Sequence, residues 1–458
     1  MSGYNIFKDS STRYSIMLPY FDKRVLFVVL VIVLLLTGYN YYQFKYFAPA
    51  DAKIAKSRGG LIIHDPALKA EVVSQGLRFP TTMAFLGPND ILVLEKNNGT
   101  VQRIVNGTML PQPLLAVNVA NKNERGMLGI AIAKHNESGG PTYVFLSYTE
   151  TKVKGSDICP KPNYCEPGHD PLGNRLYRYE LVNNKLVNPK LLLDLPAVPG
   201  PGHNGGKITI GPDNNVYFTI GDVVGYRSKT QNFPDGPDSN GTSAIYRITQ
   251  DGNAVKGVIG DKDPLDKYYA YGLRNSYGID FDPVTGKLWD TENGPSFGDE
   301  INLVEPGFNS GWRKVQGFWE TNGITYGKLV QNPTGLEDFG GKGKYSAPKF
   351  IWLNTSGPTA IKFLNSEKLG KQYQNDIFVG DFHGGNIYHF KLDQNRTGLV
   401  LNGSLADKIV NSQSELEGIK FGEGFGAVTD LQVGPYDGYL YVVSHAQGKI
   451  YRIVPQAK

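Results

Sequence analysis

The chain has 458 residues, a formal net charge of +4, 40% hydrophobic residues and 20% charged residues. This composition is that of a folded protein and excludes an intrinsically disordered chain. No run of Lys and Arg dominates any segment, so the sequence gives a nucleic-acid partner no electrostatic support. The 27 tyrosines, 22 phenylalanines and 55 glycines are typical of strands and turns, and they favour one large β-rich domain.

The first predicted element is a membrane anchor. Residues 1–24 form a short basic segment, residues 25–47 form the anchor, and Val25–Phe44 carries no charge. About 20 apolar residues span a bilayer core, and basic residues stay on the cytoplasmic side. The sequence therefore predicts a single-pass cell-membrane protein with a cytoplasmic N-terminus and an extracellular or periplasmic body. A signal peptide cleaved near residues 48–50 is the alternative interpretation.

Residues 48–60 form a short polar linker, and residues 61–458 carry a recurring unit of a turn, a short aromatic or β-branched strand, a second turn and a further strand. The unit recurs at 87–105, 141–181, 211–252, 282–294, 375–393 and 434–455. Both faces of strands such as Val216–Ile220 are apolar, as expected for a sheet between two others. Six copies predict an all-β fold, a six-bladed β-propeller, closed by a strand around Ala70–Ser74. A β-sandwich is the structural alternative.

Three long insertions rich in Gly, Pro and Asn connect the predicted strands, at 151–173, 223–242 and 313–350. Loops of this length in a propeller gather on one face, where they form the walls of a pocket. The first insertion contains Cys159 and Cys165. A disulfide in an exported loop is the favoured interpretation, and two free thiols are the alternative.

A histidine surrounded by glycines lies at 199–206, in the sequence PGPGHNGG. Such a segment gives His203 little packing, so we expect it to face the pocket as a general base. Asp222 follows the next strand and could orient the imidazole. A turn histidine and a turn aspartate without roles are the alternatives.

Two further motifs follow, at 271–278 and 291–300. Arg274 has small neighbours and could reach a ligand carboxylate, although a surface ion pair is the alternative. The Gly294-Pro295 turn exposes backbone carbonyls with the Asp299 carboxylate nearby. Oxygen atoms of these kinds are the ligands that Ca²⁺ prefers.

These motifs, in this order, resemble those of the glucose/sorbosone dehydrogenase family, which includes quinoprotein glucose dehydrogenases and aldose sugar dehydrogenases. The resemblance spans about residues 72–454. The segments that carry it are GLRFPTTMAF (76–85), ERGMLGIAI (124–132), GHNGGKITIGPDNNVYFTIGD (202–222), YGLRNSYGIDFDPVTGKLW (271–289), ENGPSFGDEINLVEPGFNSGW (292–312) and VGPYDGYLYV (433–442).

The resemblance implies a six-bladed propeller that binds pyrroloquinoline quinone and Ca²⁺ on its axis and oxidises a small sugar. His203 would remove the proton of an aldose C1 hydroxyl while hydride passes to the quinone, with Asp222 beside it. Glu124, Arg274 and Asn275 would contact the quinone or the substrate. The carbonyls of Gly294 and Pro295, with Asp299, would form the calcium site. The electron acceptor is left open.

The sequence also departs from the family pattern. Where the family often has a lysine in blade five, this chain has His383, and where it often has two arginines in blade six, residues 425–430 read FGAVTD. An unpaired buried carboxylate costs about 2–5 kcal/mol, so a tricarboxylate cofactor needs cations. Lys207, Arg125 and His383 are the candidates for that charge.

Two other functions remain open. A non-catalytic propeller would keep the scaffold and bind a glycan or a protein on its loop face, and the absent arginines favour it. Lactone or ester hydrolysis at a central Ca²⁺ is the third possibility, but no Gly-x-Ser-x-Gly motif is present.

Overall fold

The computed structural model describes residues 60–134, 140–153, 157, 169–323, 325–330 and 332–456. The chain divides into two units, Met1–Lys53 and Ile54–Lys458, and the described residues all belong to the second. The predicted anchor at 25–47 and the cysteines Cys159 and Cys165 lie outside the described residues. Within the described part of the chain, no helix has the length and apolarity needed to cross a membrane.

The described residues form six large sheets, which we call blades one to six in chain order. Blade one contains β3 (Pro80–Gly87), β4 (Asp90–Glu95), β5 (Thr100–Val105), β6 (Thr108–Met109) and β7 (Leu115–Ala116). Blade two contains β8 (Met127–Lys134), β9 (Thr142–Thr151), β10 (Pro171–Val182) and β11 (Lys185–Leu195). Blade three contains β12 (Ile208–Ile210), β13 (Val216–Ile220), β14 (Ala244–Ile248), β15 (Tyr268–Tyr271), β19 (Phe308–Asn309) and β23 (Lys344–Tyr345).

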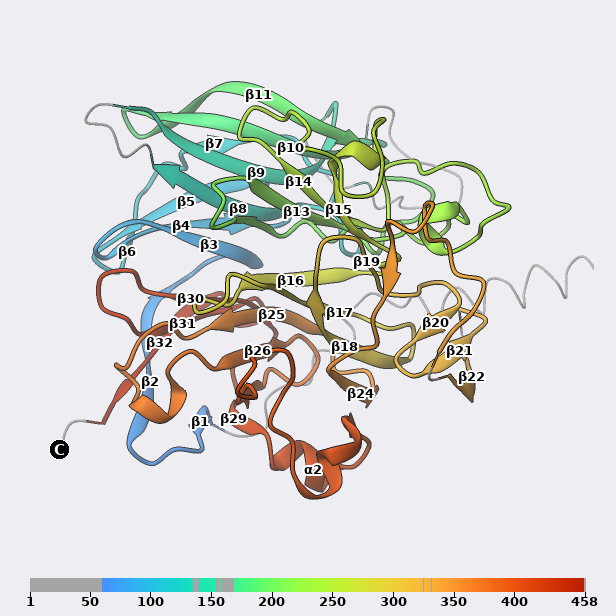
Figure 1. Ribbon diagram of the computed structural model, residues 1–458. Helices are drawn as coiled ribbons and strands as arrows, with labels where there is room; N and C mark the ends of the chain where they lie inside the picture. The colour runs from blue at the N-terminus through green and yellow to red at the C-terminus, as the bar shows by residue number, and fades with distance from the viewer. Residues whose placement is uncertain are drawn as a thin grey trace, which may run out of the picture. The chain divides into compact units, whose positions relative to one another are not determined.

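In the other three blades the first strands likewise pair antiparallel. Blade four contains β16 (Ser276–Phe281), β17 (Leu288–Glu292), β18 (Phe297–Val304), β24 (Phe350–Asn354) and β28 (Ile409–Val410). Blade five contains β25 (Pro358–Phe363), β26 (Ile377–Asp381), β27 (Ile387–Phe390), β29 (Lys420–Glu423) and β1 (Ile62–Ile63). Blade six contains β30 (Val428–Val433), β31 (Leu440–Ser444), β32 (Lys449–Pro455) and β2 (Leu68–Gln75). Helix is rare in the described residues, where α2 (Gln413–Glu417) is a single short turn (Figure 1).

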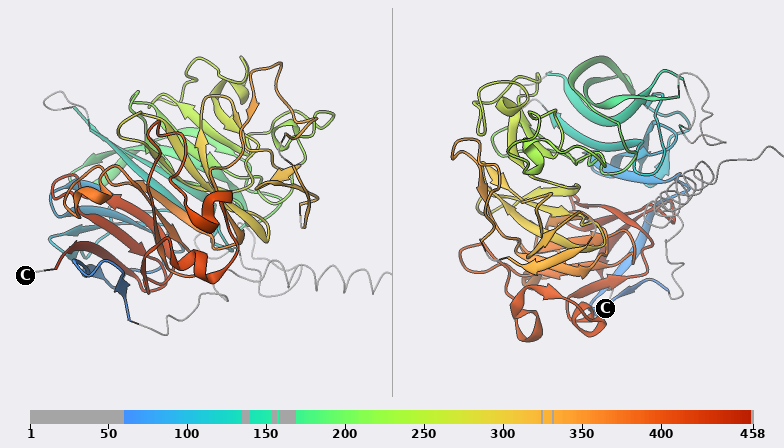
Figure 2. Two further views of the ribbon diagram at one scale, coloured as in Figure 1. Left: turned by 60° about the horizontal axis from the view of Figure 1, so that its bottom comes forward. Right: turned by 90° about the vertical axis from the view of Figure 1, so that its right-hand side faces the viewer.

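The first strands of the six blades form a closed ring. β3 packs against β8, β8 against β12, β12 against β16, β16 against β25, β25 against β30, and β30 against β3. The right-hand view of Figure 2 shows the chain running around this ring in colour order. The described body is thus all-β and propeller-like, as the recurring unit predicts, and the sandwich alternative is wrong.

Blade six joins the two ends of the described chain. β2 pairs antiparallel with β32, with Leu68 opposite Pro455 and Val72 opposite Tyr451. This pairing confirms the predicted closing strand around Ala70–Ser74. The ring is closed because a strand from the beginning of the body completes a sheet built from its end.

Apolar side chains fill the space between neighbouring blades. All five residues of Val216–Ile220 are buried, and Phe218 packs in one cluster with Phe145 and Tyr246. Burying one such side chain stabilises the fold by roughly 1.5–3 kcal/mol. This packing fixes the blades, and with them the segments that lead into the inner strands and carry the candidate site.

Two of the predicted insertions meet beside these segments. Residues 223–242 contain one 3₁₀ turn, Lys229–Gln231, and residues 313–350 build a small sheet of β20 (Val315–Gln316), β21 (Trp319–Thr321) and β22 (Tyr326–Leu329). Asn232 of the first insertion donates to the Trp312 carbonyl at the start of the second, at 2.8 Å. They therefore form one wall, as predicted, whereas most of 151–173 lies outside the described residues.

Candidate active site

His203 and Asp222 form a hydrogen-bonded pair at the beginning of blade three. Nδ1 of His203 lies 2.5 Å from Oδ1 of Asp222, and the side chains are 12% and 2% exposed. His203 has a φ of 59°, in the left-handed region that residues other than Gly seldom adopt. Since an ionised carboxylate can only accept, Nδ1 donates, and Nε2 of the neutral ring is then an acceptor. This is the arrangement of a general base with an orienting acid.

Two further donors hold Asp222 in its ionised form. Trp312 Nε1 donates to Oδ2 at 2.8 Å, and the backbone N–H of Val224 donates to Oδ1 at 2.8 Å. Burial by itself raises the pKa of Asp222, but the charges of His203 and Arg274 and the hydrogen bonds from His203 and Trp312 lower it to about 2. Asp222 is therefore a fixed negative charge behind the imidazole at every physiological pH.

Glu124 joins three blades at this point. Its Oε2 accepts the backbone N–H of His203 at 2.7 Å and the side-chain amide of Asn275 at 3.1 Å. Glu124 precedes β8 of blade two, whereas His203 and Asn275 precede β12 and β16. The structure thus brings together three residues that the sequence assigns to the cofactor or the substrate.

Arg274 turns back onto the loop that follows β17. Its Nη1 donates to the carbonyls of Asn293 and Gly294 at 2.8 and 2.9 Å, and its backbone N–H donates to Glu292 Oε1 at 2.6 Å. The guanidinium carbon lies 5.5 Å from the ring centre of Trp312. Burial lowers the pKa of Arg274, although the charges of Asp222, Glu124, Asp299 and Glu292 oppose that shift. Arg274 thus lies within the site, beside one of the carbonyls predicted to hold Ca²⁺.

The Gly294-Pro295 turn is held by Asp299. Oδ1 of Asp299 accepts the backbone N–H of Gly294 at 2.7 Å, and Oδ2 accepts those of Ser356 and Gly357 at 2.7 and 2.8 Å. Burial raises the pKa of Asp299 to about 6 against these hydrogen bonds and the charge of His383. Because three N–H groups occupy its oxygens, Asp299 positions the turn. The other predicted calcium ligands are the carbonyls of the turn, of which that of buried Gly294 accepts from Arg274 Nη1.

Gly294 is required at this position by packing. A Cβ atom added there would lie 2.0 Å from the Phe297 carbonyl oxygen. No group of three or more His, Cys, Asp or Glu side chains that could hold a metal occurs among the described residues. A calcium site here would therefore rest on backbone carbonyls, as the sequence predicts, together with oxygens of a bound ligand.

His383 lies on the rim formed by blade five. Its side chain is exposed, and its backbone N–H donates to the Ser356 carbonyl at 3.1 Å, next to the segment that Asp299 binds. Of the three candidates for the missing positive charge, Lys207 is ion-paired with Asp430, and Arg125 is paired with Asp157 at 2.6 Å. Both side chains are buried in these pairs, so His383 alone among the three is exposed on this rim.

Residues 425–430 of blade six contain Thr429 and no arginine, and His445 lies close to Thr429. Thr429 donates to the Pro80 carbonyl at 3.1 Å, and His445 Nδ1 lies 3.0 Å from the same oxygen. The His445 ring lies 5.4 Å from that of Phe79 and 5.6 Å from that of Phe382. Sequence reasoning missed His445 and Trp312. Trp312 is the last residue of the matched segment 292–312 and His445 follows the segment 433–442, but the sequence does not show which side chains they contact.

Several buried polar atoms around the site have no hydrogen-bond partner within the described ranges. They are Arg274 Nε, Asn275 Oδ1 and Asn293 Oδ1. Buried polar groups are normally paired, so these atoms indicate a place for a polar ligand between blades three and four. Arg274 Nε is a donor that fits a carbonyl or carboxylate oxygen of a quinone, whereas the two amide oxygens need an N–H or O–H group of a ligand or a cation.

Comparison with known proteins agrees with this geometry. The family model described as Glucose / Sorbosone dehydrogenase matches residues 77–452. Quinoprotein glucose dehydrogenase B of Acinetobacter calcoaceticus is 28% identical over 275 residues, which are 56% of this chain and 54% of that protein. Aldose sugar dehydrogenase YliI of Escherichia coli is 24% identical over 406 residues, which are 85% of this chain and 93% of that protein.

Solved structures show the same fold. The soluble aldose sugar dehydrogenase of Escherichia coli in the apo-form has a TM-score of 0.63 at 21% identity, covering 85% of this chain and 100% of that chain. The PQQ-bound aldose sugar dehydrogenase of Streptomyces coelicolor has a TM-score of 0.59 at 21% identity, covering 85% of this chain and 99% of that chain. The family match, the radial sheets and the loops that carry its motifs all agree, and the chain belongs to the glucose/sorbosone dehydrogenase family and has its oxidoreductase fold.

Proposed function

We propose that this protein is an aldose dehydrogenase that oxidises the C1 hydroxyl of a sugar, with His203 as the general base. The observation that carries the proposal is the 2.5 Å contact between His203 Nδ1 and Asp222 Oδ1. A histidine that only formed a turn would not require an ionised carboxylate hydrogen-bonded to its partly exposed imidazole. Relatives named as sugar dehydrogenases supply the substrate class.

In the proposed reaction, Nε2 of His203 takes the proton of the C1 hydroxyl. Asp222 stabilises the imidazolium that results, and Trp312 keeps the carboxylate in place. Such base catalysis contributes roughly 10²–10⁴ in rate. Glu124 fixes the backbone of His203 and the amide of Asn275, so the base and the neighbouring blade stay in register.

Arg274, Asn275, Glu124 and the exposed His383 would hold pyrroloquinoline quinone, and the Gly294 and Pro295 carbonyls would hold Ca²⁺. The quinone, when bound, supplies the acceptor for the hydride. The unpaired atoms of Arg274 and Asn275 support this placement. The protein would act on the extracellular or periplasmic side of a cell membrane, held there by residues 25–47.

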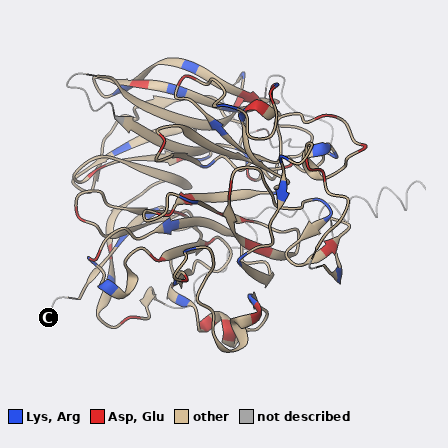
Figure 3. Cartoon of the chain, viewed as in Figure 1, with Lys and Arg blue, Asp and Glu red and all other residues tan. Residues whose placement is uncertain are grey.

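Positive and negative side chains are mixed over the described sheets, and they give no indication of a nucleic-acid surface (Figure 3).

Dye-linked sugar oxidation and a calorimetric titration with the quinone in Ca²⁺ test the proposal together. His203→Gln should lower kcat by about 10²–10⁴ and leave the quinone dissociation constant within about threefold. His389→Gln, which changes a histidine paired with Asp376 in blade five, is the matched control and should keep full activity.

A wild-type protein that binds the quinone but oxidises no aldose would contradict the proposal. If it fails to bind the quinone at all, the alternative of a non-catalytic propeller is supported. The specific observation behind that alternative is that residues 425–430 of blade six contain no arginine and that Thr429 there donates to the Pro80 carbonyl.

A further inference from the structure

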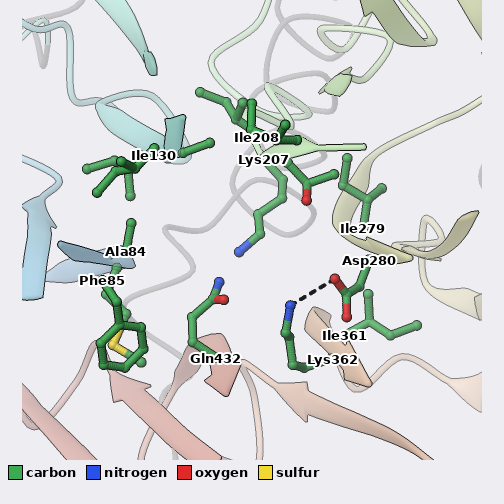
Figure 4. A pocket seen from close by; sticks show the side chains of 15 residues that line it. Ala84, Phe85, Ile130, Lys207, Ile208, Ile279, Asp280, Ile361, Lys362 and Gln432 are labelled. Carbon is green, nitrogen blue, oxygen red and sulfur yellow. Dashed lines mark hydrogen bonds and ion pairs between the residues drawn. The ribbon is translucent and has the colours of Figure 1, made fainter. Parts of the chain in front are cut away.

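A second cavity lies in the central channel, away from His203. It is lined by residues of all six inner strands and has a volume of about 190 Å³ (Figure 4). Its lining includes neither His203 nor Asp222, and Lys207 in its wall follows His203 by four residues. One water needs on the order of 10–15 Å³, so there is room for several waters or one small organic molecule.

The cavity has apolar walls and a polar centre. Ile130, Ile208, Ile279 and Ile361 come from four different blades and form much of the wall. Figure 4 shows the side chains of Lys207, Lys362 and Gln432 directed into the same space. Polar groups that converge in a cavity are one feature of a ligand site.

The two carboxylates that balance these lysines are tied to the wall. Asp430 is ion-paired with Lys207, and its Oδ2 also accepts the backbone N–H of Met83 at 2.9 Å. Gln432 Nε2 donates to both oxygens of Asp430, at 3.3 and 3.2 Å. All the accepting capacity of Asp430 is therefore used by the protein itself.

Asp280 is arranged in the same way. Its Oδ1 accepts from Lys362 Nζ at 2.9 Å, and its Oδ2 accepts the backbone N–H of Phe363 at 2.9 Å. Each ammonium group has three N–H donors. In the described contacts, Lys207 and Lys362 each use one of these donors, on an aspartate. Four N–H donors of the two ammonium groups are consequently unused in the described contacts, beside the remaining lone pairs of Asp280 and the Gln432 amide oxygen.

We propose that this cavity binds a small oxyanion, a carboxylate of the size of acetate or glycerate or an inorganic phosphate. Two ammonium groups supply the charge and the donors, and hydrogen bonds from charged donors are stronger than those between neutral groups. The Lys362 side chain is 22% exposed and that of Lys207 is 8% exposed, so Lys362 lies nearer to solvent. Because two aspartates partly compensate the lysines, the dissociation constant should be on the order of 1 mM.

Calorimetric titration of the purified full-length chain tests this inference. Acetate, glycerate and phosphate are each titrated at constant ionic strength, with chloride as the reference salt. Saturable heat with acetate or glycerate assigns the site to carboxylates, and saturable heat with phosphate alone assigns it to phosphates. Both results support an oxyanion site, and neither depends on sugar oxidation.

Two substitutions locate the binding. Lys362→Gln should weaken it at least tenfold, and Gln432→Leu, which keeps both ion pairs, should weaken it by a few-fold. Lys287→Gln is the matched control, since Lys287 is also paired with a carboxylate, at 3.2 Å, but outside the channel. No saturable heat with any of the three oxyanions, or equal heat in the Lys362 and Lys287 variants, would overturn the proposal.

Discussion

The indole nitrogen of Trp312 donates to Oδ2 of Asp222 at 2.8 Å, from a segment that is 90 residues further along the chain. This contact connects the wall of the site to the carboxylate behind His203. Replacing Trp312 with Phe keeps a ring and removes the donor. We expect kcat of sugar oxidation to fall by about tenfold with little change in KM, because a neutral hydrogen bond to a buried charge contributes roughly 1.5–3 kcal/mol. Steady-state kinetics measure the effect.

Trp319→Phe provides the control for that experiment. Trp319 lies in β21 among Phe297, Phe318 and Tyr326, without contact to Asp222. Its variant should keep wild-type kcat. Equal losses in the two variants would mean that the wall acts through general packing and that the Trp312 hydrogen bond has no particular role.

Glu124 offers a test of the junction between blades. Glu124→Ala removes the acceptor of the His203 and Asn275 N–H groups, and should lower the free energy of unfolding by about 1–3 kcal/mol while reducing kcat. Glu124→Gln keeps an oxygen at that place and should recover most of the stability. Urea denaturation followed by fluorescence compares the two variants, and equal destabilisation would contradict the assigned role.

Buried carboxyl groups in blade four should make the stability depend on pH. Burial raises the pKa of Asp290 from 3.8 to about 7, although Ser276 and Asn302 donate hydrogen bonds to it. Between about pH 4 and pH 7 the native state therefore binds a proton that the unfolded state has lost. Stability should fall as the pH rises through this range and should change no further above it, with a slope of at most about 1.4 kcal/mol per pH unit.

Asp290→Asn removes this titration and should flatten the curve of unfolding free energy between pH 4 and pH 7. Burial also raises the pKa of Glu300 to about 7, so part of the slope should remain. Asp238→Asn, at an exposed carboxylate paired with Lys229, is the control and should leave the curve unchanged. A slope that is the same in all three proteins would show that other groups titrate.

The proposed role of the Gly294-Pro295 turn in calcium binding can be tested by substitution. In Gly294→Ala the new Cβ would meet the Phe297 carbonyl oxygen at 2.0 Å, so the turn must move and its carbonyls with it. We expect a loss of at least tenfold in calcium affinity, measured by calorimetry in the presence of the quinone. Gly327→Ala in β22, where the nearest atom is 3.5 Å away, should bind calcium normally. Normal binding by the Gly294 variant would place calcium elsewhere.

The fold could be predicted because propeller blades are local in sequence. Each predicted unit, such as 434–455, pairs with itself as β31 and β32, so the turns and the apolar alternation are sufficient to find it. The motifs around His203 and Arg274 could be located for a related reason. Each lies just before the first strand of a blade, and that strand is itself recognisable from the local sequence.

Contacts between blades could not be predicted in this way. Trp312 meets Asp222, and Glu124 meets Asn275, across 90 and 151 residues. The position of Lys207 was also beyond sequence reasoning. Lys207 follows His203 by four residues, yet its ammonium group is ion-paired with Asp430 of blade six, 223 residues further along the chain. Pairings of this kind depend on which blades the ring brings together.

The pairing of β2 with β32 has a consequence for how the protein is made. Residues 68–75 leave the ribosome several hundred residues before their partners at 449–455. Until residues 449–455 have left the ribosome, β2 has no sheet to join. Blade one likewise has no neighbour on one side until β30 has been synthesised. The earlier blades can form during synthesis, but the ring can close only afterwards. Chains that terminate early would keep an open edge on each side of the gap, and such edges pair readily with other chains.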